Sequence, residues 1–353
     1  MPVATTGREA QIPRKEAPTP LCIFGVSTPL LHAAVSFLKS ALEGAGGLCA
    51  LVAANTVAGV RDGLAASRSA APTSIIFTSD SPDDETVEVF LRSGARMIVA
   101  AEDFVDSAVY LRGARGLPTP EALRFLTQTL STLAPFLTAE GVLLLHLRYA
   151  DEPLAVLLGH VFDLIGWHDL DIEAALRYAN VDRDDTLRSY AATHFPSLAA
   201  DPPSAHELTT IRALSTSYQQ LVHGQKMAAA FWPTELFLDW GQPGCFLRGP
   251  IDLTGPARFI VCGPYLHLPI GRWRARFVVR VGKNLSGNRL SLDIFAHEVL
   301  AGVTTQLPAK GLYAFDVVFD IRRAYVPLEA RIQIQQGAIE GVFEFVGVDF
   351  LAF

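Results

Sequence analysis

The sequence predicts an α/β doubly wound domain with a parallel sheet, followed by an all-β jelly-roll sandwich domain. At 353 residues the chain is too long for one ordinary hydrophobic core, so two domains are expected. Before about residue 200, short apolar runs alternate with helical patterns, which is typical of βαβ units. From about residue 235, short alternating strands follow one another with Gly and Pro turns and no helix between them.

The first domain is expected over residues 20–200. Its apolar runs are apolar on both faces, as in parallel strands covered by helices, and they lie at 21–26, 48–53, 74–77, 97–101 and 142–147. Helical patterns separate or follow these runs at 29–43, 57–69, 83–93, 104–112, 120–137, 151–165 and 171–179. Residues 1–19 mix Pro with charged residues without periodicity, which predicts a disordered tail.

Residues 201–234 are expected to link the two domains. The composition shifts to Pro, Ser, Ala and Asp over 194–203, which marks a boundary. One long helix is predicted over 204–230, because Ile211, Leu214, Tyr218 and Leu221 recur at helical spacing. This helix would brace the domains against each other.

The second domain is expected over residues 235–353. Its predicted strands are 236–240, 246–247, 258–262, 272–281, 290–295, 311–321, 328–335 and 343–350. In the strand 272–281 the odd positions from Trp273 are apolar, while four even positions are arginine. Side chains alternate across a strand, so one face is expected in the core with Trp273 and the other carries the guanidinium groups.

The polar rows of this domain are candidates for a glycan or anion site, because Arg, Asp, Glu, Gln and His side chains bind hydroxyl-rich ligands. The candidate ligand-binding residues are Tyr265, His267, Arg272, Arg274, Arg276, Asp293 and Arg331. Tyr265 and His267 are expected in a loop, open to contact. A second interpretation is equally concrete: the arginines pair across strands with Asp316, Asp320 or Glu329 and bind nothing else.

Composition limits the classes of function. The net charge of −7 argues against nucleic-acid binding. The N-terminus lacks the apolar segment of a signal peptide and no apolar run is long enough for a membrane span, so a cytoplasmic protein is expected. The four cysteines show neither CxxC pairing nor metal-ligand spacing. No catalytic motif, metal or cofactor is predicted.

Part of the second domain resembles a known pattern. Gly263-Pro264-Tyr265, Leu268-Pro269, Gly271 and the strand 272–277 are similar to GPY…LPxGxYxxxF, and residues 328–332 match a later LExRI strand. Jelly-roll domains that resemble carbohydrate-binding modules carry this pattern, often beside glycosyltransferase or sulfotransferase-like domains of bacterial polysaccharide proteins. The resemblance covers about residues 236–353. It implies a polysaccharide or saccharide ligand, with a glycosyltransferase or another polysaccharide-synthesis protein as partner.

The first domain resembles the sulfotransferase family in layout, over about residues 20–180. The loop Gly25 to Leu31, with Ser27 and Thr28, occupies the position of the family's GxPRSGTTLL but lacks its basic residue. Residues 102–111 align with RDPRDVAVSY, with Glu102 in place of Arg and Tyr110 in place of Ser. The resemblance therefore implies a degenerate donor site, because a carboxylate repels a multiply charged anionic donor. Ser27 or Thr28 is expected to cap the helix that follows.

These patterns lead to three hypotheses. The first is a non-catalytic glycan- or partner-binding protein of bacterial polysaccharide synthesis or modification, with a degenerate transferase domain. The alternative is an active sulfo- or glycosyltransferase with an atypical donor site that acts on a saccharide. The third is a structural protein whose sandwich forms a homo-oligomer.

Overall fold

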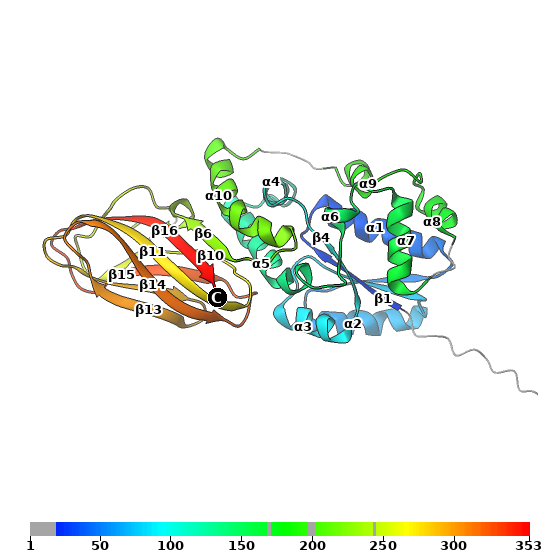
Figure 1. Ribbon diagram of the computed structural model, residues 1–353, viewed down its shortest axis with the longest axis horizontal. Helices are drawn as coiled ribbons and strands as arrows, with labels where there is room; N and C mark the ends of the chain where they lie inside the picture. The colour runs from blue at the N-terminus through cyan, green and yellow to red at the C-terminus, as the bar shows by residue number, and fades with distance from the viewer. Residues whose placement is uncertain (1–18, 168–170, 197–201, 243–244) are drawn as a thin grey trace, which may run out of the picture.

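The computed structural model describes residues 19–167, 171–196, 202–242 and 245–353, and two regions of different class lie side by side in it (Figure 1). The N-terminal region is a parallel sheet with helices on both faces, and the C-terminal region contains two antiparallel sheets. The coarse fold class is confirmed, while the jelly-roll topology stays a prediction. The predicted tail falls outside the described residues except for Thr19, and most of the predicted boundary at 194–203 also lies outside them.

The parallel sheet has the strand order β2-β3-β1-β4-β5. Its strands are β1 (Thr19–Gly25), β2 (Cys49–Ala53), β3 (Ser74–Ser79), β4 (Arg96–Ala100) and β5 (Leu143–Leu144). The connection after β1 leads toward the β2 edge, and the connection after β4 leads toward the β5 edge. The carboxyl ends of β1 and β4 therefore flank the point at which such sheets usually bind ligands.

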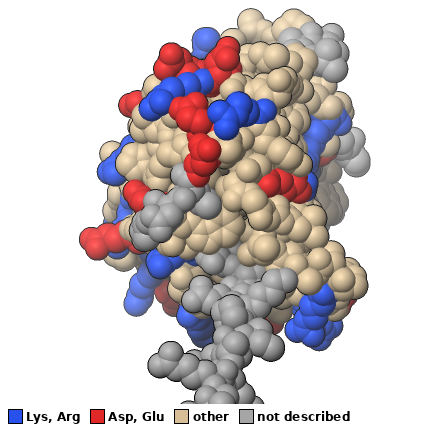
Figure 2. Space-filling model, turned by 90° about the vertical axis from the view of Figure 1, so that its right-hand side faces the viewer, with Lys and Arg blue, Asp and Glu red and all other residues tan. Residues whose placement is uncertain are grey.

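Two sets of helices cover the sheet. One face packs against α1 (Pro29–Gly44), α7 (Leu154–Ile165), α8 (Ile172–Ala179) and α9 (Leu187–His194). The other face packs against α3 (Asp84–Ser93), α4 (Phe104–Arg115) and α5 (Thr119–Leu137). The remaining helices of this region are α2 (Val57–Ser67), the short η1 (Arg68–Ala70) and α6 (Leu145–Arg148). Seen from this end of the molecule, basic and acidic side chains are intermixed rather than gathered in one basic patch (Figure 2).

Two predicted elements end earlier than expected. The strand predicted over 142–147 is only two residues long, and His146 lies on α6, where its Nδ1 accepts a hydrogen bond from the Ala101 amide at 3.2 Å. The helix predicted over 204–230 is α10 (Ala205–Val222), which ends before Gly224 with its φ of +70°. Glycine adopts such a backbone without strain, so it suits a helix end. Residues 229–233 form a strand instead, because they pair with the last strand of the chain.

The C-terminal region consists of two antiparallel sheets. One has the order β14-β11-β16-β6 and includes β8; its strands are β6 (Ala229–Pro233), β8 (Ile251–Asp252), β11 (Gly271–Lys283), β14 (Gly311–Ile321) and β16 (Val342–Ala352). The other has the order β13-β12-β15-β9-β7 and includes β10; its strands are β7 (Leu238–Asp239), β9 (Arg258–Cys262), β10 (Pro264–Leu266), β12 (Arg289–Phe295), β13 (Val299–Gln306) and β15 (Leu328–Ile334). A short η2 (Thr234–Leu236) precedes β7.

The predicted alternation of faces in these strands is confirmed. Trp273 is 2% exposed, and Phe277 and Val279 are fully buried on the same face of β11. The inner face of the other sheet contributes Leu292 and Ile332, which belong to the same apolar cluster. The two sheets thus share one core, and the polar rows lie on their outer faces.

Helix α10 joins the two regions into one packed body. It packs against α4, α5 and β6, between the parallel sheet and the sandwich (Figure 1). Tyr218 of α10 is completely buried; its ring stacks on Phe104 at 5.6 Å between centroids, and its hydroxyl donates to the carbonyl of His267. None of the helices in the described residues combines the length and apolar character needed to cross a bilayer.

Candidate functional site

The loop between β1 and α1 lies directly against the end of β4. The Val26 amide donates to the Ala100 carbonyl at 3.1 Å. A Cβ atom at Gly25 would lie 1.9 Å from that same oxygen, so only glycine permits this approach. The fold therefore brings Gly25, Ser27 and Thr28 beside Glu102, which follows β4.

The carboxylate of Glu102 lies at the N-terminus of α1. Burial raises the pKa of this carboxylate, and the nearby Thr28 hydroxyl and Leu30 backbone amide oppose that rise. The Thr28 hydroxyl itself donates to the Val26 carbonyl at 3.3 Å. The prediction that Ser27 or Thr28 caps this helix is confirmed in position, because Thr28 is the N-cap residue, but the Thr28 side chain makes no capping hydrogen bond with a described residue. A helix N-terminus attracts anions. Here a carboxylate of the chain lies at this position, because Glu102 follows the neighbouring strand β4.

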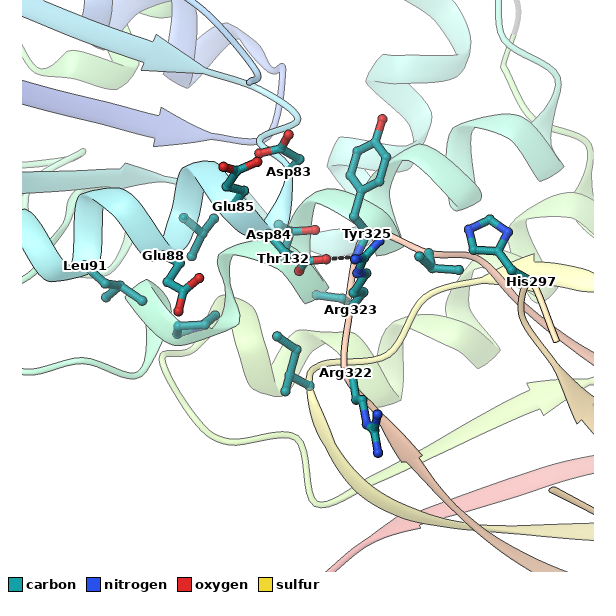
Figure 3. A pocket seen from close by; sticks show the side chains of 15 residues that line it. Asp83, Asp84, Glu85, Glu88, Leu91, Thr132, His297, Arg322, Arg323 and Tyr325 are labelled. Carbon is teal, nitrogen blue, oxygen red and sulfur yellow. Dashed lines mark hydrogen bonds between the residues drawn. The ribbon is translucent and has the colours of Figure 1, made fainter. Parts of the chain in front are cut away.

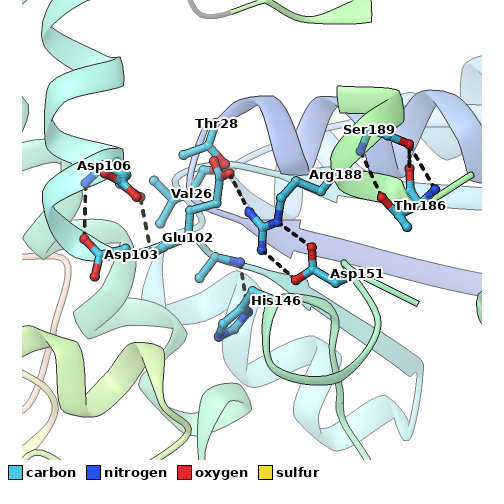
Figure 4. A network of polar contacts seen from close by, with 12 residues as sticks. Val26, Thr28, Glu102, Asp103, Asp106, His146, Asp151, Thr186, Arg188 and Ser189 are labelled. Carbon is cyan, nitrogen blue, oxygen red and sulfur yellow. Dashed lines mark hydrogen bonds and ion pairs between the residues drawn. The ribbon is translucent and has the colours of Figure 1, made fainter. Parts of the chain in front are cut away.

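Arg188 of α9 completes this cluster (Figure 4). Its guanidinium lies 3.9 Å from Glu102 and makes two hydrogen bonds with Asp151, at 2.8 and 3.2 Å. Those hydrogen bonds lower the pKa of Asp151 and raise that of Arg188. The charge of Arg188 is thus neutralised by two carboxylates of the protein.

A second cation reaches the loop from α4. Arg115 Nη2 donates to Ser27 Oγ and to Asp80 Oδ2, each at 2.5 Å. His32 Nε2 lies 3.3 Å from the same Ser27 hydroxyl, and burial lowers the pKa of His32. The loop itself contains no Lys or Arg, and Arg115 is far from it in the sequence. Ser27 is only 1% exposed and fully engaged, so it offers little to a substrate.

Tyr110 also belongs to the carboxyl edge. It lies half-buried on α4, where burial raises its pKa and the Glu102 carboxylate adds to that rise. The five residues predicted as a degenerate donor site are therefore neighbours in the fold.

The predicted ligand-binding residues of the sandwich are not gathered in one place. Arg272, Arg274 and Arg276 lie on the outer side of β11, whereas Asp293 and Arg331 lie on the outer side of the other sheet. Tyr265 is in β10, and His267 follows it. The two sheets face away from each other on these sides, so no single ligand contacts both rows.

The register between β11 and β14 explains which carboxylates lie opposite the arginines of β11. Arg276 lies opposite Asp316 and Arg272 opposite Asp320, while Glu329 is in the other sheet. The Arg276 guanidinium makes two hydrogen bonds with Asp316, at 2.8 and 2.9 Å, and these lower the pKa of Asp316. Solvent screens exposed pairs of this kind, so they contribute little to stability.

Arg274 and Arg276 also line a hollow of about 390 Å³, which we call the arginine groove. Its floor is the outer side of β11 and β16, and α10 forms one wall; the lining includes Thr216, Ser217, Gln220, Phe231, Asp349 and Leu351. Arg274 Nε has no hydrogen-bond partner among the described residues, although it lies 3.9 Å from Asp316 Oδ2. Burial raises the pKa of Asp349, although the positive charge of Arg276 lowers it in part.

Asp293 and Arg331 form a covered pair on the other sheet. Arg331 Nε donates to Asp293 at 2.8 Å, and the two side chains are 17% and 13% exposed. The guanidinium lies 3.9 Å from the centre of the Phe295 ring and 5.2 Å from that of Phe259. These contacts hold both charged groups in place and leave little of them for a ligand.

The structure corrects the expectation for His267. It is 3% exposed, not in an open loop, and burial lowers its pKa to about 4. Its Nδ1 has no hydrogen-bond partner among the described residues. Tyr265 is half-buried under Arg124, whose guanidinium lies 4.9 Å from the ring centre. Helices α5 and α10 cover this segment, which the sequence pattern of the loop alone did not indicate.

Comparison with known proteins gives limited information. No family model matches the sequence, and no curated protein matches it significantly. Among solved structures, the carbohydrate-binding module TmCBM61 in complex with β-1,4-galactotriose is 10% identical, with a TM-score of 0.23, over 36% of this chain and 83% of that one. A proposed sugar-binding protein from Bacteroides thetaiotaomicron is 9% identical, with a TM-score of 0.20, over 36% of this chain and 83% of that one. A glycosylation-associated protein complex from Streptococcus agalactiae is 10% identical, with a TM-score of 0.23, over 79% of this chain and 46% of that one. Scores of this size carry no weight for fold or function.

Proposed function

We propose that this protein binds a saccharide in the arginine groove and acts without catalysis in bacterial polysaccharide synthesis or modification. The observation that carries the proposal is the convergence of Arg274, Arg276 and Asp349 on one hollow beside an apolar wall. Guanidinium groups donate pairs of hydrogen bonds and a carboxylate accepts them, which matches neighbouring hydroxyls of a sugar ring.

The size and lining of the groove support the same class of ligand. Its volume of about 390 Å³ lies at the lower end of the range for small-molecule sites. Phe231 and Leu351 offer apolar surface to the C–H face of a sugar, while Thr216 and Gln220 on α10 add polar groups. Because the lining comes from both α10 and the sandwich, a bound saccharide would contact the two regions at once.

The parallel-sheet region supports the non-catalytic part of the proposal. Glu102 takes the helix N-terminus that an anionic donor would need, and Arg188 is held by Asp151. We infer that this region is a degenerate transferase scaffold. A transferase with an atypical donor site is the competing function, and donor binding decides between the two.

Replacing both groove arginines, Arg274→Ala with Arg276→Ala, is expected to weaken saccharide binding at least about tenfold. Hydrogen bonds to charged groups contribute about 1.5–3 kcal/mol each, and 1.4 kcal/mol corresponds to a factor of ten. A glycan array identifies a ligand for the wild-type chain, and calorimetric titration then compares the affinities of the variants.

The matched control is Arg280→Ala. Arg280 lies on the same side of β11 and pairs with Glu344 at 3.0 Å, outside the residues that line the groove. It should leave the affinity unchanged. Equal affinity of the double variant and the wild-type chain would remove the groove as the binding site.

A further inference from the structure

A second depression crosses the boundary between the two regions. One hollow of about 820 Å³ lies between α3, α5 and the turn that follows β14. A second hollow of about 670 Å³ continues along the β12–β13 turn. The two share His297, Arg322, Arg323 and Val326 as lining residues, so together they form one extended depression, which we call the interdomain cleft.

The interdomain cleft is predominantly acidic. Six carboxylates line it against two arginines, Arg322 and Arg323; the six are Asp83, Asp84, Glu85, Glu88, Glu298 and Asp320. Figure 3 shows Asp83, Glu85 and Glu88 along α3, with Arg323 and Tyr325 across from them. Glu88 pairs with Arg92, and the charge of Arg323 acts on Asp84. Arg322 and Glu85 make no salt bridge with a described residue, so these two charges are open to a ligand.

One contact holds the two walls of the cleft together. The Asp84 carboxylate of α3 accepts hydrogen bonds from the Ala324 amide at 3.0 Å and from the Tyr325 amide at 3.1 Å. This places the β14–β15 turn against the parallel-sheet region. The cleft is therefore formed before any ligand arrives, and less ordering is required on binding.

Apolar surface is exposed between the charged groups. The side chain of Tyr325 is 44% exposed, and those of Ile270 and Leu91 are 54% and 42% exposed. All three line the larger hollow. An aromatic ring beside acidic groups attracts cations and also packs against the C–H face of a sugar ring.

We propose that the interdomain cleft binds a saccharide chain that carries free amino groups. This inference rests on the proposed function, and it assigns a second site with a different ligand class. Because the two hollows are continuous, the cleft fits a chain of several sugar units better than a single sugar. The excess of carboxylates selects ammonium groups and repels polyanions. Arg322 and Arg323 donate to the hydroxyl and ring oxygens that such units also carry.

Calorimetric titration of the full chain at pH 6 tests this inference. The probes are hexamers of glucosamine, of N-acetylglucosamine and of galacturonate. Glucosamine hexamer is expected to bind at least about tenfold more tightly than the N-acetylated hexamer, and galacturonate hexamer more weakly still. Raising the salt concentration should weaken only the glucosamine binding markedly.

Two variants locate the site. Glu85→Gln with Glu88→Gln removes two carboxylates and should weaken glucosamine binding about fivefold or more, and Tyr325→Ala should also weaken it. Glu121→Gln removes an exposed carboxylate of α5 that does not line the cleft, and it should have no effect.

The outcomes separate this inference from the proposed function. Equal affinity for the amino and N-acetylated hexamers, or cleft variants that behave like Glu121→Gln, would overturn the cleft site. If the arginine-groove variant alone abolishes binding of every saccharide, the proposed function stands and the cleft assignment fails. If the wild-type chain binds none of the glycans, including those of the array, both fail.

Discussion

Lowering the pH from 7 to 4 is expected to cost the folded chain about 3 kcal/mol of stability through His267 alone. Burial lowers the pKa of His267 from 6.5 to about 4, with Arg124 adding a smaller unfavourable charge. Between these two values the unfolded chain binds more protons than the folded chain. The contribution of His267 to the stability of the folded chain is therefore fully present above pH 6.5. It is lost as the pH falls from 6.5 to about 4. Urea unfolding at pH 7 and at pH 4 measures the loss.

The variant His267→Gln should remove that part of the pH dependence. Its unfolding free energy should fall about 3 kcal/mol less than that of the wild-type chain between pH 7 and pH 4. His223→Gln is the control, because His223 is exposed at the end of α10. An identical pH dependence in the His267 variant and the wild-type chain would show that His267 is not buried at this interface.

The alternation of the sandwich strands could be predicted from sequence because its cause is local. Side chains of a strand point alternately to the two faces, so the rows that contain Trp273, Leu292 and Ile332 identify the core without knowledge of the partner strands. The helices of the first region were predicted for the same reason, since their apolar positions recur within one turn or two.

The elements that were missed depend on distant partners. The predicted helix extends to residue 230, but residues 229–233 form β6 because they pair with β16 near the end of the chain. The accessibility of His267 was misjudged in the same way. Its own loop has the composition of a surface turn, and Tyr218 of α10 covers it. Neither β16 nor α10 can be identified as a partner from the residues that are close in sequence.

The candidate sites were predicted in part for similar reasons. Arg276 does pair with Asp316 across the strands, as one of the two alternatives predicts, and its part in ligand binding stays a prediction. The arginine groove itself needs α10 as a wall, which no strand pattern indicates.

At the carboxyl edge of the parallel sheet, the charge of Glu102 is evident from the sequence. The place of its carboxylate at the N-terminus of α1, and the approach of Arg115 and Arg188 from other helices, depend on the fold.

The position of Glu102 also leads to an expected result for nucleotide donors. A donor site with a Kd of about 10 µM would stabilise the protein by about 2.7 kcal/mol at about 1 mM ligand. We expect no measurable stabilisation of the wild-type chain by 3′-phosphoadenosine 5′-phosphate or by nucleotide sugars at that concentration. The measurement is urea unfolding with and without ligand, supported by thermal shift.

The physical reason is that the N-terminus of α1 already has its anion. A donor phosphate would have to displace the Glu102 carboxylate from the Leu30 amide and the Thr28 hydroxyl, and then lie beside the displaced charge. Glu102→Gln removes the charge and keeps a hydrogen-bond acceptor, so it should permit weak phosphate binding that the wild-type chain lacks. Glu121→Gln, an exposed carboxylate in the first turn of α5, is the matched control and should bind no better than wild type. A true donor site would stabilise the wild-type chain by about 2 kcal/mol or more. That result would mean that phosphate displaces the Glu102 carboxylate and that the parallel-sheet region is an active transferase.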